Sequence, residues 1–151
     1  MRILVTDNKV DRIQDSQMLA ALAKCGSVDI VHNGRDAVIA YVNTIAKGTF
    51  YDLIVMDHHT SVLDGFAAVE MIRMYELEHR KTGKPTMVCV ISSAVICQHH
   101  FEERFGKDQR THLLQKPVKP DLIAFLAGSV AAELEMESVP VCKRKSVCLQ
   151  A

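Results

Sequence analysis

The clearest pattern in the chain is an unbroken apolar run that ends in a carboxylate, Leu53-Ile54-Val55-Met56-Asp57. Short continuous apolar runs are typical of strands that are buried on both faces, as the central strands of parallel sheets are. A second unbroken apolar run at 87–91, and shorter apolar stretches at 2–6 and 112–115, predict three more strands. Residues 27–32 alternate apolar and polar positions, which predicts a fifth strand with one wetter face.

Segments with apolar residues at helical spacing separate these strands, and most of them start at helix-start or turn signals. The expected starts are Asn8, the Asn33-Gly34 turn, the pair Asp64-Gly65 and the pair Pro120-Asp121. A weaker pattern predicts one more helix over 95–105. The last helix shows the clearest apolar face, which contains Leu122, Phe125, Leu126, Val130 and Leu134.

Five strands that alternate with five helices predict an α/β fold, a flavodoxin-like, doubly wound sheet of parallel strands with helices on both faces. We expect one domain over residues 1–137 and a flexible tail over 138–151, where the apolar pattern is lost. The tail is too short to fold alone, so we expect a stand-alone domain without an output domain. A terminal domain cut from a larger protein is the alternative.

Composition narrows the class of protein. The 151 residues are 48% hydrophobic and 24% charged, which is typical of a globular domain. The formal net charge is zero, so nothing global favours nucleic acid, and we expect a monomer. The five cysteines lack metal or disulfide spacing, and the start of the chain lacks a secretion leader. We therefore expect a cytoplasmic protein, or a nuclear one if it is eukaryotic.

Four polar side chains fall at the expected carboxyl ends of strands: Asp7, Asp57, Ser92 and Lys116. With the strand order 2-1-3-4-5, strands one and three are neighbours where the order reverses, and ligands bind there. Asp7 and Asp57 would then share one crevice and repel each other unless a cation lies between them, and oxygen ligands suit Mg²⁺. Lysine and serine can bind a phosphoryl group. The set predicts phosphoryl transfer to an aspartate.

Four stretches resemble the receiver domain of two-component response regulators, the fold shared with the bacterial chemotaxis regulator. They are Ile3-Leu4-Val5-Thr6-Asp7-Asn8, Tyr51-Asp52-Leu53-Ile54-Val55-Met56-Asp57, Asp64-Gly65-Phe66 and Lys116-Pro117-Val118. The resemblance covers about residues 1–137. In style it is similar to the receivers of hybrid kinases and of eukaryotic phosphorelays.

The resemblance implies a role for each candidate residue. Asp57 would accept a phosphoryl group from a phosphohistidine on a sensor histidine kinase or a histidine phosphotransfer protein. Asp7, Asp57 and the backbone carbonyl of His59 would bind Mg²⁺. Lys116 would bind the phosphoryl oxygens and form a cis bond to the next residue, and Ser92 would be the switch hydroxyl. The chain would then be a signalling domain rather than an enzyme, apart from catalysing its own phosphorylation and dephosphorylation.

The sequence also departs from the receiver pattern. Thr6 stands where the first of two acids is usual, which predicts weaker Mg²⁺ binding. Thr60-Ser61 replaces the usual Met-Pro pair, which predicts a looser loop. Leu113 replaces a common aromatic residue, so coupling through a ring is absent. A one-residue shift would put Ile91 at the switch position instead of Ser92 and would leave no switch hydroxyl.

These departures keep two other interpretations open. One is a degenerate receiver that acts as a docking or scaffold module without being phosphorylated. The other is a flavin-binding protein on the same sheet topology, but the acidic loop after the first strand would repel a phosphate in the absence of a metal. Separately, Cys148 is the fourth residue from the end of the sequence, as in a prenylation signal, so a membrane contact is expected only if Cys148 is lipidated.

Overall fold

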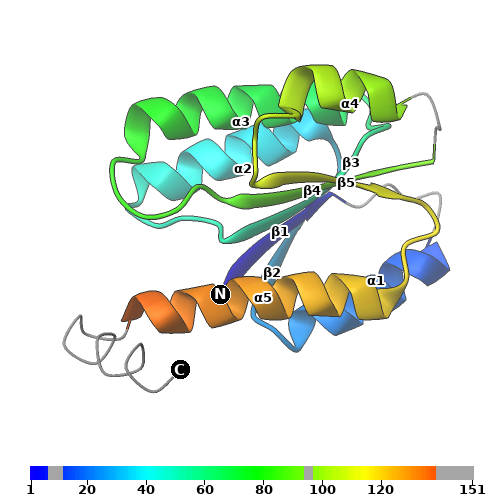
Figure 1. Ribbon diagram of the computed structural model, residues 1–151, viewed down its shortest axis with the longest axis horizontal. Helices are drawn as coiled ribbons and strands as arrows, with labels where there is room; N and C mark the ends of the chain where they lie inside the picture. The colour runs from blue at the N-terminus through cyan, green and yellow to red at the C-terminus, as the bar shows by residue number, and fades with distance from the viewer. Residues whose placement is uncertain (7–11, 94–96, 139–151) are drawn as a thin grey trace.

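The computed structural model describes residues 1–6, 12–93 and 97–138, and within them five parallel strands form one sheet (Figure 1). The strand order is β2-β1-β3-β4-β5, as the sequence predicts, so the order reverses between β1 and β3. The strands are β1 (Arg2–Thr6), β2 (Ser27–Val31), β3 (Leu53–Asp57), β4 (Met87–Ser92) and β5 (Thr111–Gln115).

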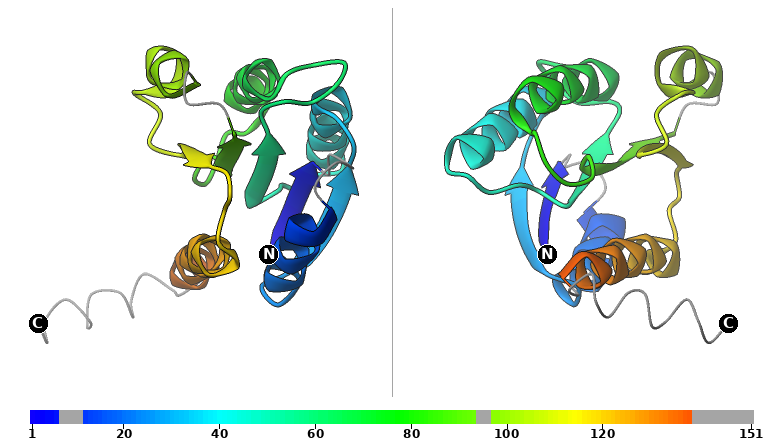
Figure 2. Two further views of the ribbon diagram at one scale, coloured as in Figure 1. Left: turned by 90° about the vertical axis from the view of Figure 1, so that its right-hand side faces the viewer. Right: turned by 60° about the vertical axis from the view of Figure 1, so that its left-hand side comes forward.

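Five helices in the described ranges alternate with the strands and cover both faces of the sheet. Figures 1 and 2 show α1 and α5 below the sheet and α2, α3 and α4 above it, which makes three layers. The predicted flavodoxin-like alternation is therefore confirmed. The helices are α1 (Arg12–Ala23), α2 (Gly34–Ala46), α3 (Gly65–His79), α4 (Cys97–Phe105) and α5 (Pro120–Ser138).

Alternate residues of the central strands enter two separate cores, because successive side chains of a strand point to opposite faces. Val55 of β3 packs with Leu22 of α1 and Ile123 of α5. Its neighbour Met56 packs with Phe66 and other residues of the upper layer. All five residues of β3 are buried, which explains why its sequence is an unbroken apolar run.

Helix starts follow local sequence signals. Asn33 caps α2, with its side-chain oxygen accepting from the backbone N–H of Asp36 at 2.8 Å, and Asp64 caps α3 in the same way. Asn33-Gly34 is thus the start of a helix as well as a turn. The Asn8 cap and the residues 94–96 before α4 lie outside the described residues.

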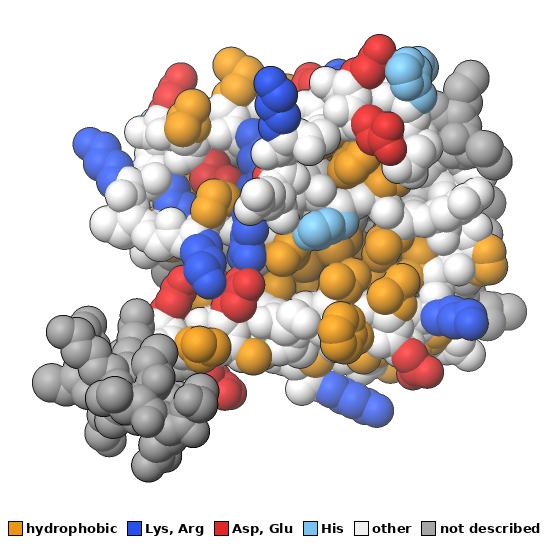
Figure 3. Space-filling model, viewed as in Figure 1, with side chains coloured by type: hydrophobic (Ala, Val, Ile, Leu, Met, Phe, Trp, Pro, Cys, Tyr) orange, Lys and Arg blue, Asp and Glu red, His pale blue; other side chains and the backbone are white. Residues whose placement is uncertain are grey.

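The predicted apolar face of α5 is partly wrong. Ile123, Ala127 and Val130 are the buried residues of α5, whereas Phe125 is 70% exposed and Leu122 is 42% exposed. α5 packs against α1 along one stripe, and its other apolar flank faces out. Figure 3 shows hydrophobic side chains gathered on this side of the molecule, over α5 and the edge of the sheet. α5 also extends to Ser138, one residue beyond the predicted domain end.

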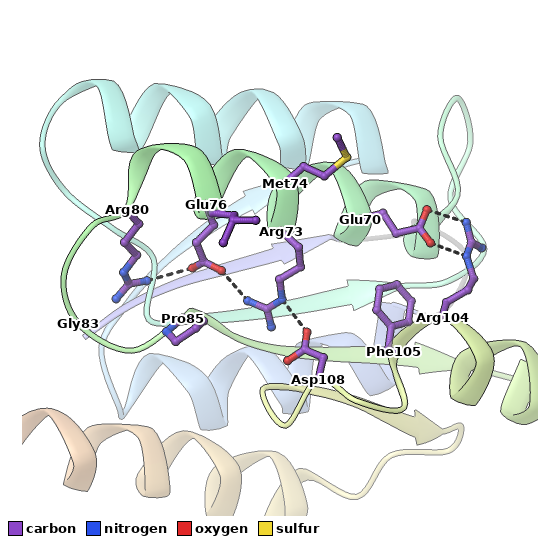
Figure 4. A pocket seen from close by; sticks show the side chains of 11 residues that line it. Glu70, Arg73, Met74, Glu76, Arg80, Gly83, Pro85, Arg104, Phe105 and Asp108 are labelled. Carbon is purple, nitrogen blue, oxygen red and sulfur yellow. Dashed lines mark hydrogen bonds and ion pairs between the residues drawn. The ribbon is translucent and has the colours of Figure 1, made fainter.

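A buried carboxylate, Glu76 of α3, joins α3 to the sheet and to α2. It is 5% exposed and accepts hydrogen bonds from the Tyr41 hydroxyl at 2.8 Å and the Thr86 backbone N–H at 2.7 Å. Arg73 and Arg80 form ion pairs with it at 2.8 and 3.2 Å (Figure 4). Both carboxylate oxygens therefore accept hydrogen bonds, three on Oε1 and one on Oε2.

None of the helices in the described part of the chain combines the length and the apolar character that a bilayer span requires.

Candidate functional site

Asp57 is the last residue of β3 and lies at the carboxyl edge of the sheet, next to the point where the strand order reverses. Asp57 is only 8% exposed. A small cleft opens beside it, and the lining combines apolar walls with one cation. The lining residues are Thr6, Met18, Val55, Asp57, Ile91, Lys116 and Val118.

Three polar contacts hold Asp57, one through its backbone and two through its carboxylate. Its backbone N–H donates to the Thr6 hydroxyl oxygen at 2.7 Å, and this bond is buried. Its carboxylate oxygen Oδ1 accepts from the backbone N–H of His59 at 3.1 Å. The other oxygen, Oδ2, lies 3.0 Å from the Lys116 ammonium. The carboxylate is thus oriented from both sides, while the cleft leaves it open to a small reactant.

Lys116 reaches Asp57 because it directly follows β5, at the same carboxyl edge of the sheet. Its backbone N–H donates to the Ser92 carbonyl at 2.8 Å, which fixes the end of β5 against the end of β4. The peptide bond between Lys116 and Pro117 is cis, as the receiver resemblance predicted. The Lys116 side chain is 24% exposed, so the ion pair with Asp57 is largely shielded from water.

The residues after Asp57 pack closely against the start of α3. His58 donates its backbone N–H to the Ile91 carbonyl at 2.8 Å, and its ring lies over Phe66 at a centroid distance of 4.0 Å. Its ring nitrogen Nδ1 is buried and has no partner among the described residues. Burial, the largest influence, lowers the pKa of His58. A Cβ on Gly65 would come within 2.5 Å of the Asp57 carbonyl oxygen, so this close packing requires glycine.

Thr60 holds the rest of this loop. Its hydroxyl donates to the Leu63 carbonyl and accepts from the Gly34 backbone N–H at 3.1 Å, which ties the loop to the start of α2. The sequence predicted a looser loop here because proline is missing; the structure shows that a threonine supplies two hydrogen bonds in its place. The neighbouring Val62 has a positive φ of 75°, which is unusual for a β-branched residue.

The structure therefore brings together two of the predicted site residues, Asp57 and Lys116, and places the backbone of His59 beside them. Asp7 lies outside the described residues. Ser92 is 2% exposed and directly follows Ile91, which is the in-register neighbour of Asp57 and lines the cleft.

By strand alternation Ser92 shares the face of Val90, and Leu113 packs against the core on that same face. Ser92 and the residue that replaces the usual aromatic therefore lie on the upper side of the sheet. The switch role of Ser92 stays a prediction.

Sequence reasoning missed the contact between Thr6 and the backbone of Asp57. The signal available was indirect: a hydroxyl residue at the end of the strand that pairs with β3. The direction of such a side chain depends on how far the two strands are staggered, which the sequence pattern does not specify.

The donors at this site suit a hard cation such as Mg²⁺. The Asp57 carboxylate and the His59 carbonyl are oxygen ligands, and Asp7 follows β1 directly in the sequence. Within the described residues no group of three or more His, Cys, Asp or Glu side chains gathers to hold a metal.

Comparison with solved structures identifies the fold. The receiver domain of the response regulator Ssk1, crystallised with the histidine phosphotransfer protein Ypd1 from Saccharomyces cerevisiae, has a TM-score of 0.68 and 20% identity, over 93% of each chain. The receiver domain of the sensor histidine kinase PA1611 from Pseudomonas aeruginosa, with a magnesium ion in its active site cleft, has a TM-score of 0.61 and 22% identity, over 87% of this chain and 97% of that one. The chain has the fold of response regulator receiver domains.

Curated sequences point in the same direction over a shorter stretch. Histidine kinase 5 of Arabidopsis thaliana is 36% identical over 74 residues, and Probable histidine kinase 1 of Oryza sativa subsp. indica is 40% identical over 74 residues. The match covers 49% of this chain and only 7% of the length of either kinase. No family profile matches the chain.

Proposed function

We propose that the chain is a receiver that accepts a phosphoryl group on Asp57 from a phosphohistidine, in a Mg²⁺-dependent histidine-to-aspartate relay. One observation carries the proposal: a nearly buried carboxylate faces a shielded lysine at the edge of the sheet where ligands of this fold bind. A buried ion pair contributes little to stability on its own, so its placement at this edge favours a chemical role.

In the proposed reaction an Asp57 carboxylate oxygen attacks the phosphorus atom of the phosphohistidine. The P–N bond breaks as the new P–O bond forms, and the imidazole leaves with the electron pair and takes up a proton. The His59 backbone N–H donates to Oδ1 and so fixes the orientation of the carboxylate for the attack. Lys116 starts 3.0 Å from Oδ2 and moves to a phosphoryl oxygen as the negative charge shifts there.

Mg²⁺, when bound by Asp7, Asp57 and the His59 carbonyl, would neutralise charge on the phosphoryl oxygens. The chain's own contribution is to shield the site: Val55, Ile91 and Val118 form the apolar walls of the cleft. We propose that Ser92 responds to the phosphoryl group from the end of the neighbouring strand, although Ile91 is the residue of that strand that lines the cleft.

The proposed partner is a histidine kinase or a histidine phosphotransfer protein. Two findings support it: a receiver that binds such a transfer protein shares the fold over nearly the whole chain, and the curated relatives are histidine kinases. Because the match covers a small share of each kinase, this domain could serve as part of a larger kinase or on its own, and both arrangements use the same site.

The test is phosphorylation of the purified protein by a small-molecule phosphodonor, with and without Mg²⁺, followed by intact mass. We expect one phosphoryl group to be added only with Mg²⁺, and none on the Asp57→Asn variant. A Lys116→Met variant keeps the acceptor but loses the cation, and we expect it to react at least about tenfold more slowly.

The second candidate is a docking module that is not phosphorylated, and the neutral Thr6 at an acid position favours it. Absence of any mass increase at saturating Mg²⁺, in a protein that melts cooperatively, would support this candidate and reject the first.

A further inference from the structure

Thr6 is the one polar side chain of β1 that touches the phosphoacceptor residue. Its hydroxyl oxygen accepts the Asp57 backbone N–H at 2.7 Å, and both residues are buried, at 6% and 8% exposure. In receivers that this chain resembles, the corresponding position usually carries an acid. The chain therefore has a neutral, hydrogen-bonding group where a negative charge is expected.

The Thr6 hydroxyl takes the place of a backbone hydrogen bond between β1 and β3. β1 and β3 pair in register from Ile3 opposite Leu53 to Val5 opposite Val55, and the pairing stops there. Beyond this point the Asp57 N–H needs an acceptor, because an unpaired buried N–H is costly. Thr6 supplies the acceptor with its side chain and so fixes the backbone from which the reactive carboxylate projects.

The same hydroxyl still has a proton to donate. A hydroxyl can accept and donate at once, and within the described residues Thr6 is used only as an acceptor. Thr6 lines the cleft together with Asp57 and Lys116, so a group bound in the cleft lies within reach of that proton. A phosphoryl oxygen would accept it, whereas a carboxylate at this position would repel that oxygen.

We propose that Thr6 is a positioning residue of the Asp57 site. It gives the site a neutral hydrogen bond in place of a negative charge, and the site binds cations more weakly as a result. Its oxygen holds the Asp57 backbone, its proton binds a phosphoryl oxygen beside Lys116, and the missing charge weakens Mg²⁺ binding. The contact with a phosphoryl oxygen rests on the proposed function, whereas the hold on the Asp57 backbone and the weaker Mg²⁺ binding can be tested without it.

Three substitutions separate these effects. Thr6→Ser keeps the hydroxyl, Thr6→Val has the same shape without it, and Thr6→Asp restores the acid. Each is measured by Mg²⁺ titration followed through backbone amide resonances, by hydrogen exchange at the Asp57 amide, and by the rate of phosphorylation from a small-molecule phosphodonor. A thermal melt of each variant shows that it is folded.

We expect Thr6→Asp to bind Mg²⁺ at least about tenfold more tightly than the natural protein, because a third carboxylate adds to the attraction of a divalent cation. Thr6→Val should leave Mg²⁺ affinity within about twofold, speed exchange of the Asp57 amide, and slow phosphorylation by about tenfold, the effect of one lost hydrogen bond. Thr6→Ser should match the natural protein in all three measurements.

Two results would overturn the inference: Thr6→Asp with unchanged Mg²⁺ affinity, or Thr6→Val with an unchanged Asp57 amide and an unchanged rate. If the natural protein takes up no phosphoryl group at saturating Mg²⁺, the proposed function fails, and the metal titration and the amide exchange still decide the role of Thr6.

Discussion

Removing the charge of Glu76 should destabilise the protein strongly, although Glu76 lies far from the proposed site along α3. In the change Glu76→Gln the side chain keeps its shape but retains only one oxygen acceptor. If that oxygen still serves Tyr41 and Thr86, the new NH₂ group faces the Arg73 guanidinium, which had donated at 2.8 Å. Two arginines then lose their shared counterion in a site that is 5% exposed.

Breaking a buried pair by removing one partner costs about 3–5 kcal/mol. Arg73 retains other acceptors, the Asp108 carboxylate at 2.8 Å and the Thr86 carbonyl at 2.8 Å, so the lower end of that range applies. We expect a loss of about 3 kcal/mol in the free energy of unfolding, which corresponds to a drop of roughly 6–12 °C in Tm for a domain of this size.

The assay is urea denaturation followed by far-UV circular dichroism, with a thermal melt as a second measure. The matched control is Glu78→Gln, the same change two residues further along α3 on an exposed side chain, which should stay within about 0.5 kcal/mol of the natural protein. A loss below about 1 kcal/mol in Glu76→Gln would refute the reasoning that this network is a central support of the fold.

The pH dependence of this difference gives an independent check. Burial acts to raise the pKa of Glu76, but the hydrogen bonds from Thr86 and Tyr41 and the charge of Arg73 outweigh it and hold the pKa below the ordinary 4.5. A carboxyl with a lowered pKa stabilises the folded state fully above its unfolded value and loses this effect as the pH falls through its folded value. The gap between the natural protein and Glu76→Gln should thus be constant near neutrality and shrink below pH 4.5.

Three further changes should have smaller effects, each read as a change in the free energy of unfolding. Val62→Gly should stabilise by about 1 kcal/mol, because glycine adopts a φ of 75° without strain; a lower stability would contradict this. Thr60→Val should cost about 1–2 kcal/mol by leaving the Gly34 N–H without its acceptor, whereas Ser61→Ala on the exposed side of the same loop should be neutral. Arg104→Gln should cost less than about 1 kcal/mol, because the pair it forms with α3 is exposed to water; a cost above about 2 kcal/mol would show a greater role.

The parts of the fold that follow from periodicity were predictable. β3 reads as buried because every one of its residues is apolar up to Asp57, and the alternation of strands and helices restricts the topology to few choices. The meeting of Asp57 and Lys116 then follows, since each ends a parallel strand at the same edge of one sheet.

Features that depend on the direction of one side chain were not predictable. Phe125 and Val130 are both apolar residues of α5, and the sequence pattern does not say which of them lies in the stripe that packs against the rest of the fold; Val130 is buried and Phe125 is exposed. Glu76 looks like a surface charge on a helix, and its burial depends on donors outside that helix, the Tyr41 hydroxyl of α2 and the Thr86 backbone N–H just before β4. Thr6 likewise contacts Asp57 only because of the local stagger of two strands.

The most direct test of the central claim is to locate the phosphoryl group. The protein is phosphorylated with a small-molecule phosphodonor and Mg²⁺, reduced with borohydride, which converts an aspartyl phosphate to homoserine, and mapped by peptide mass spectrometry. We expect homoserine at position 57 and at no other aspartate, with none in Asp57→Asn. An unmodified Asp57 in a folded protein at saturating Mg²⁺, or homoserine at another aspartate, would contradict it.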